Sequence, residues 1–232
     1  MLQSEQAPVE SKLTEKLSRF IVSMRVFLYV FLGVMTIGLL VYFIFTEIAK
    51  NQREAASILA EKTTEVYSEW VLEGDEEKKK QLEEKILEET EIILNAYPKQ
   101  YAAQRALYIR GSVFYENEDW QKAYNEYERL FAKFLKSYLA EEALFLAAVC
   151  REEMGNFDES IELYTRFTDS YSESPRTPHA YFSLGRLNEM KARYEEAKSF
   201  YNTLKLDYPS SNWTNLAINR IIDLTRRGKI SE

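Results

Sequence analysis

A repeat of 37 residues constrains the fold of this chain more than any other feature of its sequence. A fixed period between about 20 and 50 residues is typical of stacked supersecondary units, which commonly present a long surface to a partner. Three independent sets of residues keep the spacing: Ala106, Ala143, Ala180 and Ala217; Tyr127, Tyr164 and Tyr201; and Tyr97, Phe134, Tyr171 and Tyr208.

Each repeat is predicted to fold as a helix, a tight turn and a second helix. Trp120, Ala123, Tyr127, Leu130 and Phe134 recur at steps of three or four, as residues on one face of a helix do. Short polar segments at 117–119, 155–158 and 191–193 predict the turns. A small residue precedes a second one by 12 positions, as closely crossing helices require: Gly111 and Ala123, Ala148 and Ser160, Gly185 and Ala197.

This order of small, small, aromatic and proline residues resembles the tetratricopeptide repeat family, most clearly at Gly185, Ala197, Tyr201 and Pro209. The family's usual repeat is about 34 residues long. The three extra residues are predicted to follow the proline position, between one repeat and the next. With its Tyr-Pro pairs at 97–98 and 208–209, this longer form resembles tetratricopeptide proteins of the bacterial cell envelope. Those include the ancillary subunit of the Sec translocon, the lipoprotein of the outer-membrane Bam complex, and the periplasmic coordinator of cell division.

The resemblance spans residues 50–227 and has four departures. Arg110 replaces a usual leucine, Ser160 replaces alanine, and Leu135 and Ser172 stand where proline is expected. The middle repeats are therefore expected to be somewhat irregular.

A second constraint is the uncharged segment 26–46, VFLYVFLGVMTIGLLVYFIFT. Its 21 residues reach roughly 31 Å as a helix, enough to cross a bilayer. A buried core helix and a cleaved signal peptide are the alternatives. Ala55, Leu59, Thr63, Val66 and Trp70 then continue a helical stripe without Gly or Pro, so the membrane helix is expected to run on.

The segment is predicted to be an uncleaved signal anchor in the inner membrane. A short leading tail and a long following domain favour an N-terminus in the cytoplasm and the repeats in the periplasm, although the bias of basic residues is slight. Leu13, Leu17, Phe20, Ile21 and Met24 share a helical face, which predicts a short amphipathic stretch along the membrane. The alternative is that the membrane helix simply begins early.

The expected chain is all-α, a single N-terminal transmembrane helix followed by a right-handed tetratricopeptide solenoid. Its expected parts are a cytoplasmic tail at 1–25, the transmembrane helix at 26–46, a degenerate first repeat at 47–98, three tetratricopeptide-like repeats at 99–209, a C-terminal capping helix at 210–228 and a tail at 229–232.

The inventory of reactive residues speaks against an enzyme. The chain has one histidine, one cysteine and a net charge of −7, and it lacks a glycine-rich phosphate loop or metal-ligand spacing. No cofactor, metal, nucleic acid or small-molecule substrate is therefore expected. His179 is expected at the surface or in a groove and Cys150 in the core, and Trp213 is expected to pack the last helix.

The concave face is the remaining candidate site. The resemblance places the first helix of each repeat on this face, where Tyr108, Phe145 and Phe182 recur 37 residues apart as one aromatic ridge. Tyr115, Glu152, Arg186 and Glu189 flank it, with Glu116 and Glu153. Such a groove suits an extended or helical apolar segment. The alternative is that the three rings only pack between repeats.

The predicted function is a membrane-anchored adaptor or chaperone-like subunit that binds envelope proteins or exported polypeptides, first of all at the Sec translocon. The alternatives are a scaffold for outer-membrane or division machinery and a static structural spacer in a large envelope complex.

Overall fold

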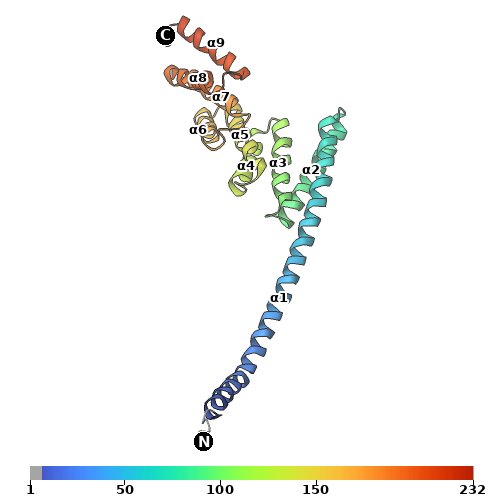
Figure 1. Cartoon of the computed structure of the whole chain (residues 1–232). Helices are drawn as coiled ribbons and strands as arrows, with labels where there is room; N and C mark the ends of the chain where they lie inside the picture. Colours follow the sequence, from blue (N-terminus) through green and yellow to red (C-terminus); the bar gives the residue numbers. More distant parts are fainter. Residues whose placement is uncertain (1–6, 232) are drawn as a thin grey trace. The chain divides into compact units, whose positions relative to one another are not determined.

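The computed structural model describes residues 7–231, with side chains from Thr14 onward. The predicted ends of both tails, residues 1–6 and 232, lie outside the described residues, as does the side chain of Leu13. Within the described range the chain forms nine α-helices and no strand, which confirms the predicted all-α class. The helices are α1 (Ala7–Leu72), α2 (Glu76–Ala96), α3 (Tyr101–Glu116), α4 (Trp120–Lys133), α5 (Tyr138–Glu153), α6 (Phe157–Ser170), α7 (Thr177–Met190), α8 (Tyr194–Asp207) and α9 (Asn212–Arg226) (Figure 1).

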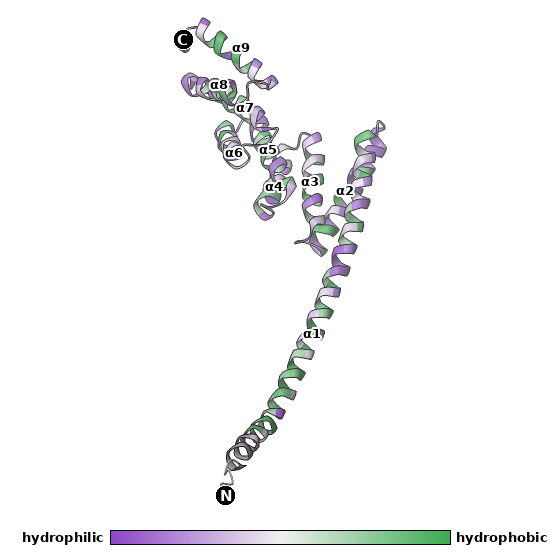
Figure 2. Cartoon of the chain, in the orientation of Figure 1, coloured by the Kyte–Doolittle hydropathy of each residue, from purple (hydrophilic) through white to green (hydrophobic). Residues whose placement is uncertain are grey.

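The chain divides by internal packing into two units, Met1–Glu54 and Ala55–Glu232. Among the described residues, the first unit consists of the N-terminal part of α1, which carries a long apolar stretch (Figure 2). None of its most apolar window is buried within the protein, so the buried core helix is excluded. By length and composition this stretch is a candidate membrane span. The helix continues without a break to Leu72, as the stripe of apolar residues predicts.

The second unit begins with the last turns of α1, followed by α2, which is the segment expected to form a degenerate first repeat. The last turns of α1 pack on α2 and α3 through Val66, Trp70, Ile86, Ile109 and Val113, which are all buried. The hydroxyl of Thr63 also donates to Glu89 Oε2 at 3.2 Å. Asp75 caps the start of α2 by accepting hydrogen bonds from two backbone amides.

Three helix pairs follow, α3 with α4, α5 with α6 and α7 with α8, and α9 packs against both α7 and α8. The turn inside each pair uses one residue with a left-handed backbone, at a spacing of 37 residues: Glu118, Gly155 and Ala192, with φ of 58°, 75° and 57°. The helices therefore end and begin at the predicted polar segments.

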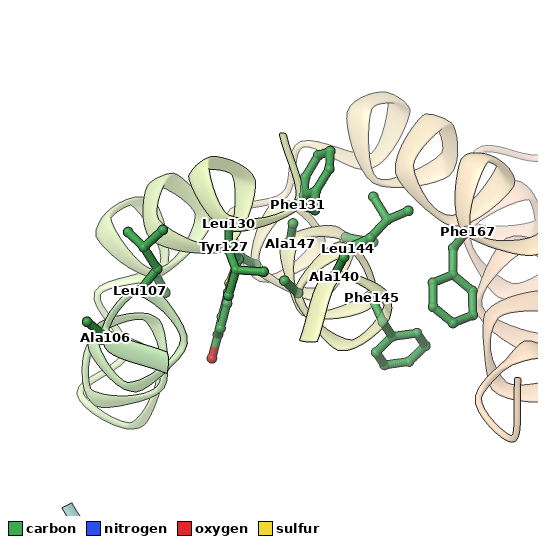
Figure 3. Packing of buried hydrophobic residues seen from close by; sticks show 14 of the residues in the cluster. Ala106, Leu107, Tyr127, Leu130, Phe131, Ala140, Leu144, Phe145, Ala147 and Phe167 are labelled. Atoms are coloured by element: carbon green, nitrogen blue, oxygen red, sulfur yellow. The ribbon is translucent and has the colours of Figure 1, made fainter. Parts of the chain in front are cut away.

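The alanine and tyrosine sets form the core of these repeats. Ala106, Ala143, Ala180 and Ala217 are buried, as are Tyr127, Tyr164 and Tyr201. Tyr127 on α4 lies near Leu107 of α3, and Phe145 of α5 faces Phe167 of α6 (Figure 3). The period of 37 residues in the sequence thus corresponds to one layer of core packing that recurs in each helix pair.

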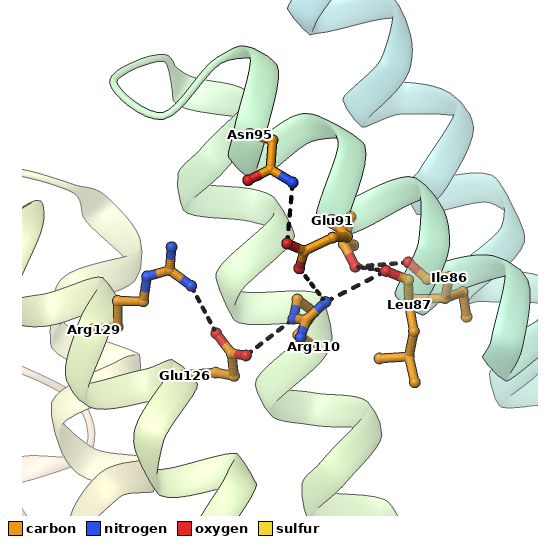
Figure 4. A network of polar contacts seen from close by, with 8 residues as sticks. Ile86, Leu87, Glu91, Asn95, Arg110, Glu126 and Arg129 are labelled. Atoms are coloured by element: carbon orange, nitrogen blue, oxygen red, sulfur yellow. Dashed lines mark hydrogen bonds and ion pairs between the residues drawn. The ribbon is translucent and has the colours of Figure 1, made fainter.

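Arg110 shows how a charged residue replaces the leucine expected at its position. Its Nε donates to Glu126 Oε1 of α4 at 3.0 Å, and its Nη1 donates to Glu91 Oε2 of α2 and to the Leu87 carbonyl, both at 3.3 Å (Figure 4). One side chain on α3 therefore joins three helices.

Candidate protein-binding groove

The three predicted groove rings come from α3, α5 and α7, one from the first helix of each pair. Tyr108 and Phe182 are half-buried, whereas Phe145 is only 2% exposed. The structure therefore does not bring the three rings into one exposed ridge. Phe145 belongs to the packing between repeats, and Tyr108 and Phe182 retain accessible surface.

Residues supplied by the following repeat bury Phe145. The His179 ring lies 5.0 Å from the Phe145 ring between centroids, and the Arg176 guanidinium carbon lies 4.8 Å from it. From its own repeat, the rings of Tyr164 and Phe167 lie at 5.5 and 5.4 Å. The phenylalanine is thus enclosed by α5, α6 and α7.

The last helix partly covers Phe182. The Trp213 ring of α9 lies 5.3 Å from the Phe182 ring, and it stacks on His179 at 3.8 Å with an angle of 7° between the planes. Trp213 therefore packs the last helix, as predicted. His179 lies between the Phe145 and Trp213 rings, and burial lowers the pKa of its imidazole to about 4, helped by Arg176 and Arg186.

The predicted polar margins make contacts within the protein. Arg186 forms an ion pair with Glu152 of the preceding repeat. Glu189 is buried, forms an ion pair with Arg220 of α9 and accepts a hydrogen bond from Tyr201 at 3.0 Å. The ring of Tyr115 packs edge-on against Trp120 at 5.1 Å. Arg186 thus joins two successive repeats, Glu189 joins α7 to α8 and α9, and Tyr115 packs within its own helix pair.

An open cleft remains beside Tyr108, with a volume of about 160 Å³. Its lining includes Tyr67 of α1, Arg105, Tyr108 and Ile109 of α3, and Tyr138 and Leu139 of α5. We call it the Tyr108 cleft. Sequence reasoning identified Tyr108 but missed Arg105 and Tyr138. The spacing of 37 residues between Tyr101 and Tyr138, whose hydroxyls lie 2.7 Å apart, was a signal that pointed there.

Burial raises the pKa of the Tyr67 and Tyr108 hydroxyls, so both stay protonated and can donate hydrogen bonds. The chemistry of the cleft is therefore that of aromatic rings, aliphatic side chains, hydroxyl donors and one guanidinium.

The residues that the structure describes contain no cluster of His, Cys, Asp or Glu suited to a metal ion. Cys150 is buried as expected, and burial raises the pKa of its thiol to about 12.

A model of the tetratricopeptide repeat family matches residues 110–175 and 151–211. A comparison with curated proteins gives no match. The matched residues run from the second half of α3 through α8, so this part of the chain contains tetratricopeptide repeats. The general role of such repeats is to mediate protein–protein interactions, and proteins that carry them are typically not catalytic.

Proposed function

We propose that this tetratricopeptide chain is a single-pass adaptor of the bacterial inner membrane, with its N-terminus in the cytoplasm and its repeats in the periplasm. There it binds protein partners of the cell envelope through the concave face of its repeats. The first candidate partner system is the Sec translocon, where the repeats would receive or hand on exported polypeptides in a chaperone-like way.

The observation that carries the proposal is the combination of an exposed apolar helical stretch with tetratricopeptide repeats in one chain. The first is suited to a bilayer and the second to a protein partner. The proposed location in the inner membrane and periplasm rests on the sequence resemblance to envelope proteins.

A static spacer within an outer-membrane, division or other envelope complex is the second candidate. The observation that favours it is the internal use of the predicted groove residues. Phe145 is covered, and Glu152, Arg186 and Glu189 are paired between repeats. On this alternative the concave face holds the solenoid in shape and contacts one constant neighbour.

Site-specific photocrosslinking separates the two functions. A photoreactive phenylalanine analogue replaces Tyr108 or Phe182 in the full chain, and the same analogue at buried Phe145 is the control. The adaptor proposal expects crosslinks to several exported chains from positions 108 and 182 and few from 145. A single constant neighbour at both exposed positions would favour the spacer instead. Copurification in mild detergent then identifies whether the translocon or an assembly complex is bound.

Membrane orientation is tested with single cysteines, because buried Cys150 is expected to stay unlabelled in the folded protein. Exposed Glu128 is replaced by cysteine in one variant and Lys16 in another. An impermeant maleimide added to intact spheroplasts should label Glu128→Cys and leave Lys16→Cys unlabelled. The reverse pattern would refute the proposed topology.

A further inference from the structure

The Tyr108 cleft differs from the equivalent place one repeat later, although the helices are related by the same period. There, Arg176 and His179 cover Phe145. The residues 37 positions earlier are Leu139 and Glu142, and the cleft beside Tyr108 stays open. The opening therefore results from which side chains the second repeat supplies.

The same difference between the two repeats leaves one cation, Arg105, without an ion-pair partner among the described residues. Glu142 forms an ion pair with Arg176, which lies 34 residues further along the chain. Thirty-seven residues before Glu142 stands Arg105, and 37 residues before Arg176 stands Leu139. An arginine and a leucine therefore occupy the places of the ion pair. Both residues line the Tyr108 cleft.

Arg105 is unusual among the arginines of the second unit. Between residues 55 and 231, all arginines except Arg105 and Arg166 form an ion pair. Arg166 is exposed, lies over the Phe131 ring and does not line the Tyr108 cleft. Arg105 is half-buried, and its guanidinium carbon lies 5.9 Å from the centre of the Tyr101 ring. It retains donors for an incoming carboxylate.

The rest of the cleft suits a single large apolar side chain. A volume of about 160 Å³ is close to the apolar cavity of about 150 Å³ that holds one benzene ring. Ile109 and Leu139 supply aliphatic surface, and Tyr67, Tyr108 and Tyr138 supply rings. Tyr138 is 67% exposed, so one wall is accessible from solvent.

We infer that the Tyr108 cleft binds a peptide segment of a protein partner in which an Asp or Glu side chain stands beside a large aromatic or aliphatic one. The apolar side chain enters the cleft, and the carboxylate pairs with the Arg105 guanidinium. This inference rests on the proposed adaptor function and gives its partner a chemistry. Because the protein carries a net charge of −7, an acidic segment without the apolar anchor is repelled as a whole. Recognition therefore requires both groups together.

A random dodecapeptide library displayed on phage, selected on the full chain in mild detergent, tests the inference. Recovered peptides should be enriched in Asp or Glu adjacent to Phe, Trp, Tyr, Leu or Ile. Arg105→Gln should abolish the acidic enrichment, whereas the matched variant Arg166→Gln should preserve it. For the most enriched peptide, fluorescence anisotropy should give binding that is weaker by about tenfold or more with Arg105→Gln. Replacing the peptide's acidic residue by its amide should weaken wild-type binding similarly.

Tyr138→Ala provides a second variant that should fold normally, because the side chain is largely exposed. It should weaken the same peptide by removing one wall of the cleft. If peptides bind equally well to the Arg105→Gln variant, the inference is wrong although protein binding by the repeats stands. Absence of any selected peptide also overturns it, while crosslinks from Phe182 to exported chains would still support the adaptor.

Discussion

Gly111 and Gly185 set how closely the two helices of a repeat approach. A Cβ atom at Gly111 would lie 2.6 Å from Cε1 of Tyr127, and one at Gly185 would meet the Tyr201 ring even more closely. Contacts this short do not occur without movement of the ring. The second repeat has Ala148 at this position, and there the Tyr164 ring packs against Phe145.

The first prediction concerns Gly185→Ala. The added methyl group forces the buried Tyr201 ring to move, so the free energy of unfolding should fall by about 1–3 kcal/mol. Urea denaturation of the full chain in detergent, followed by circular dichroism, measures the change. Gly74→Ala is the matched control, since no atom lies within 4 Å of its added Cβ, and its effect should stay within about 0.5 kcal/mol. Equal effects would show that packing at Tyr201 is not the cause.

The second prediction concerns the pH dependence that His179 confers. Burial lowers its pKa from the ordinary value of about 6.5 to about 4 in the folded state, so the unfolded chain binds more protons between these two pH values. Its contribution to stability is therefore complete above about pH 6.5 and is lost as the pH falls through 4. Partial exposure reduces this contribution to about 1–2 kcal/mol.

Because His179 is the chain's single histidine, selective isotope labelling gives one imidazole resonance whose titration reports this pKa directly. A midpoint near 6.5 in the folded protein would contradict the prediction. In the variant His179→Gln, this part of the pH dependence between 6.5 and 4 should disappear.

For Phe145, the sequence predicts the position of the residue but not the exposure of its side chain. Periodicity correctly places it with Tyr108 and Phe182 on the first helices of the pairs. It does not report what covers each ring, because that depends on non-repeating residues about 31–34 positions later: Leu139 and Glu142, Arg176 and His179, or Trp213 and Leu216. The three rings are equivalent in register and different in exposure.

At the scale of elements, the turns inside the three pairs share one backbone conformation and differ in sequence. Gly155 takes its left-handed φ of 75° at little cost, whereas Ala192 takes φ of 57° despite its Cβ atom. A Cβ at Gly155 would find no atom within 4 Å, so only the backbone conformation opposes a side chain there.

The third prediction uses this difference. Ala192→Gly should raise the free energy of unfolding by about 0.5–1 kcal/mol, and Gly155→Ala should lower it by about 1 kcal/mol. Thermal unfolding of the two variants and the wild type in the same detergent gives the comparison. Changes of the same sign in both variants would refute the argument from φ.

The fourth prediction concerns Arg110, which joins α2, α3 and α4. Arg110→Ala leaves the carboxylate of Glu126, only 12% exposed, without its main partner, so unfolding should become easier by about 1–3 kcal/mol. Removing the stranded charge in the double variant Arg110→Leu, Glu126→Gln should recover part of this loss. Arg227→Ala, which breaks a more exposed pair with Asp223, is the control and should change stability little. Urea denaturation of the wild type and the three variants measures these changes in the free energy of unfolding.

The sequence predicted where the helices of each pair meet, because polar turns interrupt a strong apolar periodicity. From the sequence, Arg110 could be recognised only as a departure from the usual leucine. Its role depends on Glu91 and Glu126, which lie 19 residues before it and 16 after it and become neighbours only when the three helices pack.

At the scale of the whole molecule, the chain joins two units whose apolar side chains are covered to different extents. In the second unit, apolar side chains are buried between successive helices. In the first, the apolar window is entirely uncovered by protein. Hydropathy and length predicted this difference from the sequence, whereas what covers the apolar window does not belong to the part of the chain that the structure describes.

The fifth prediction tests the membrane span directly. The full chain should stay in the membrane pellet after an alkaline carbonate wash, because 21 uncharged residues match the hydrocarbon thickness. A chain that starts at residue 47 should appear in the supernatant, and its helical circular dichroism signal per residue should be unchanged. Recovery of the shortened chain in the pellet would place the anchor elsewhere.

The stacked rings of His179 and Trp213 also equip the protein with an optical reporter that needs no label. Trp213 belongs to α9 and His179 to α7, so their overlap exists only while the last helix is docked. A ligand, a truncation or a denaturant that lifts α9 separates an indole from the imidazole stacked on it and changes the indole emission. Subtracting the signal of a Trp213→Phe variant isolates this emission from that of the other two tryptophans. Opening of the solenoid's C-terminal end can thus be followed in real time through the emission of one indole.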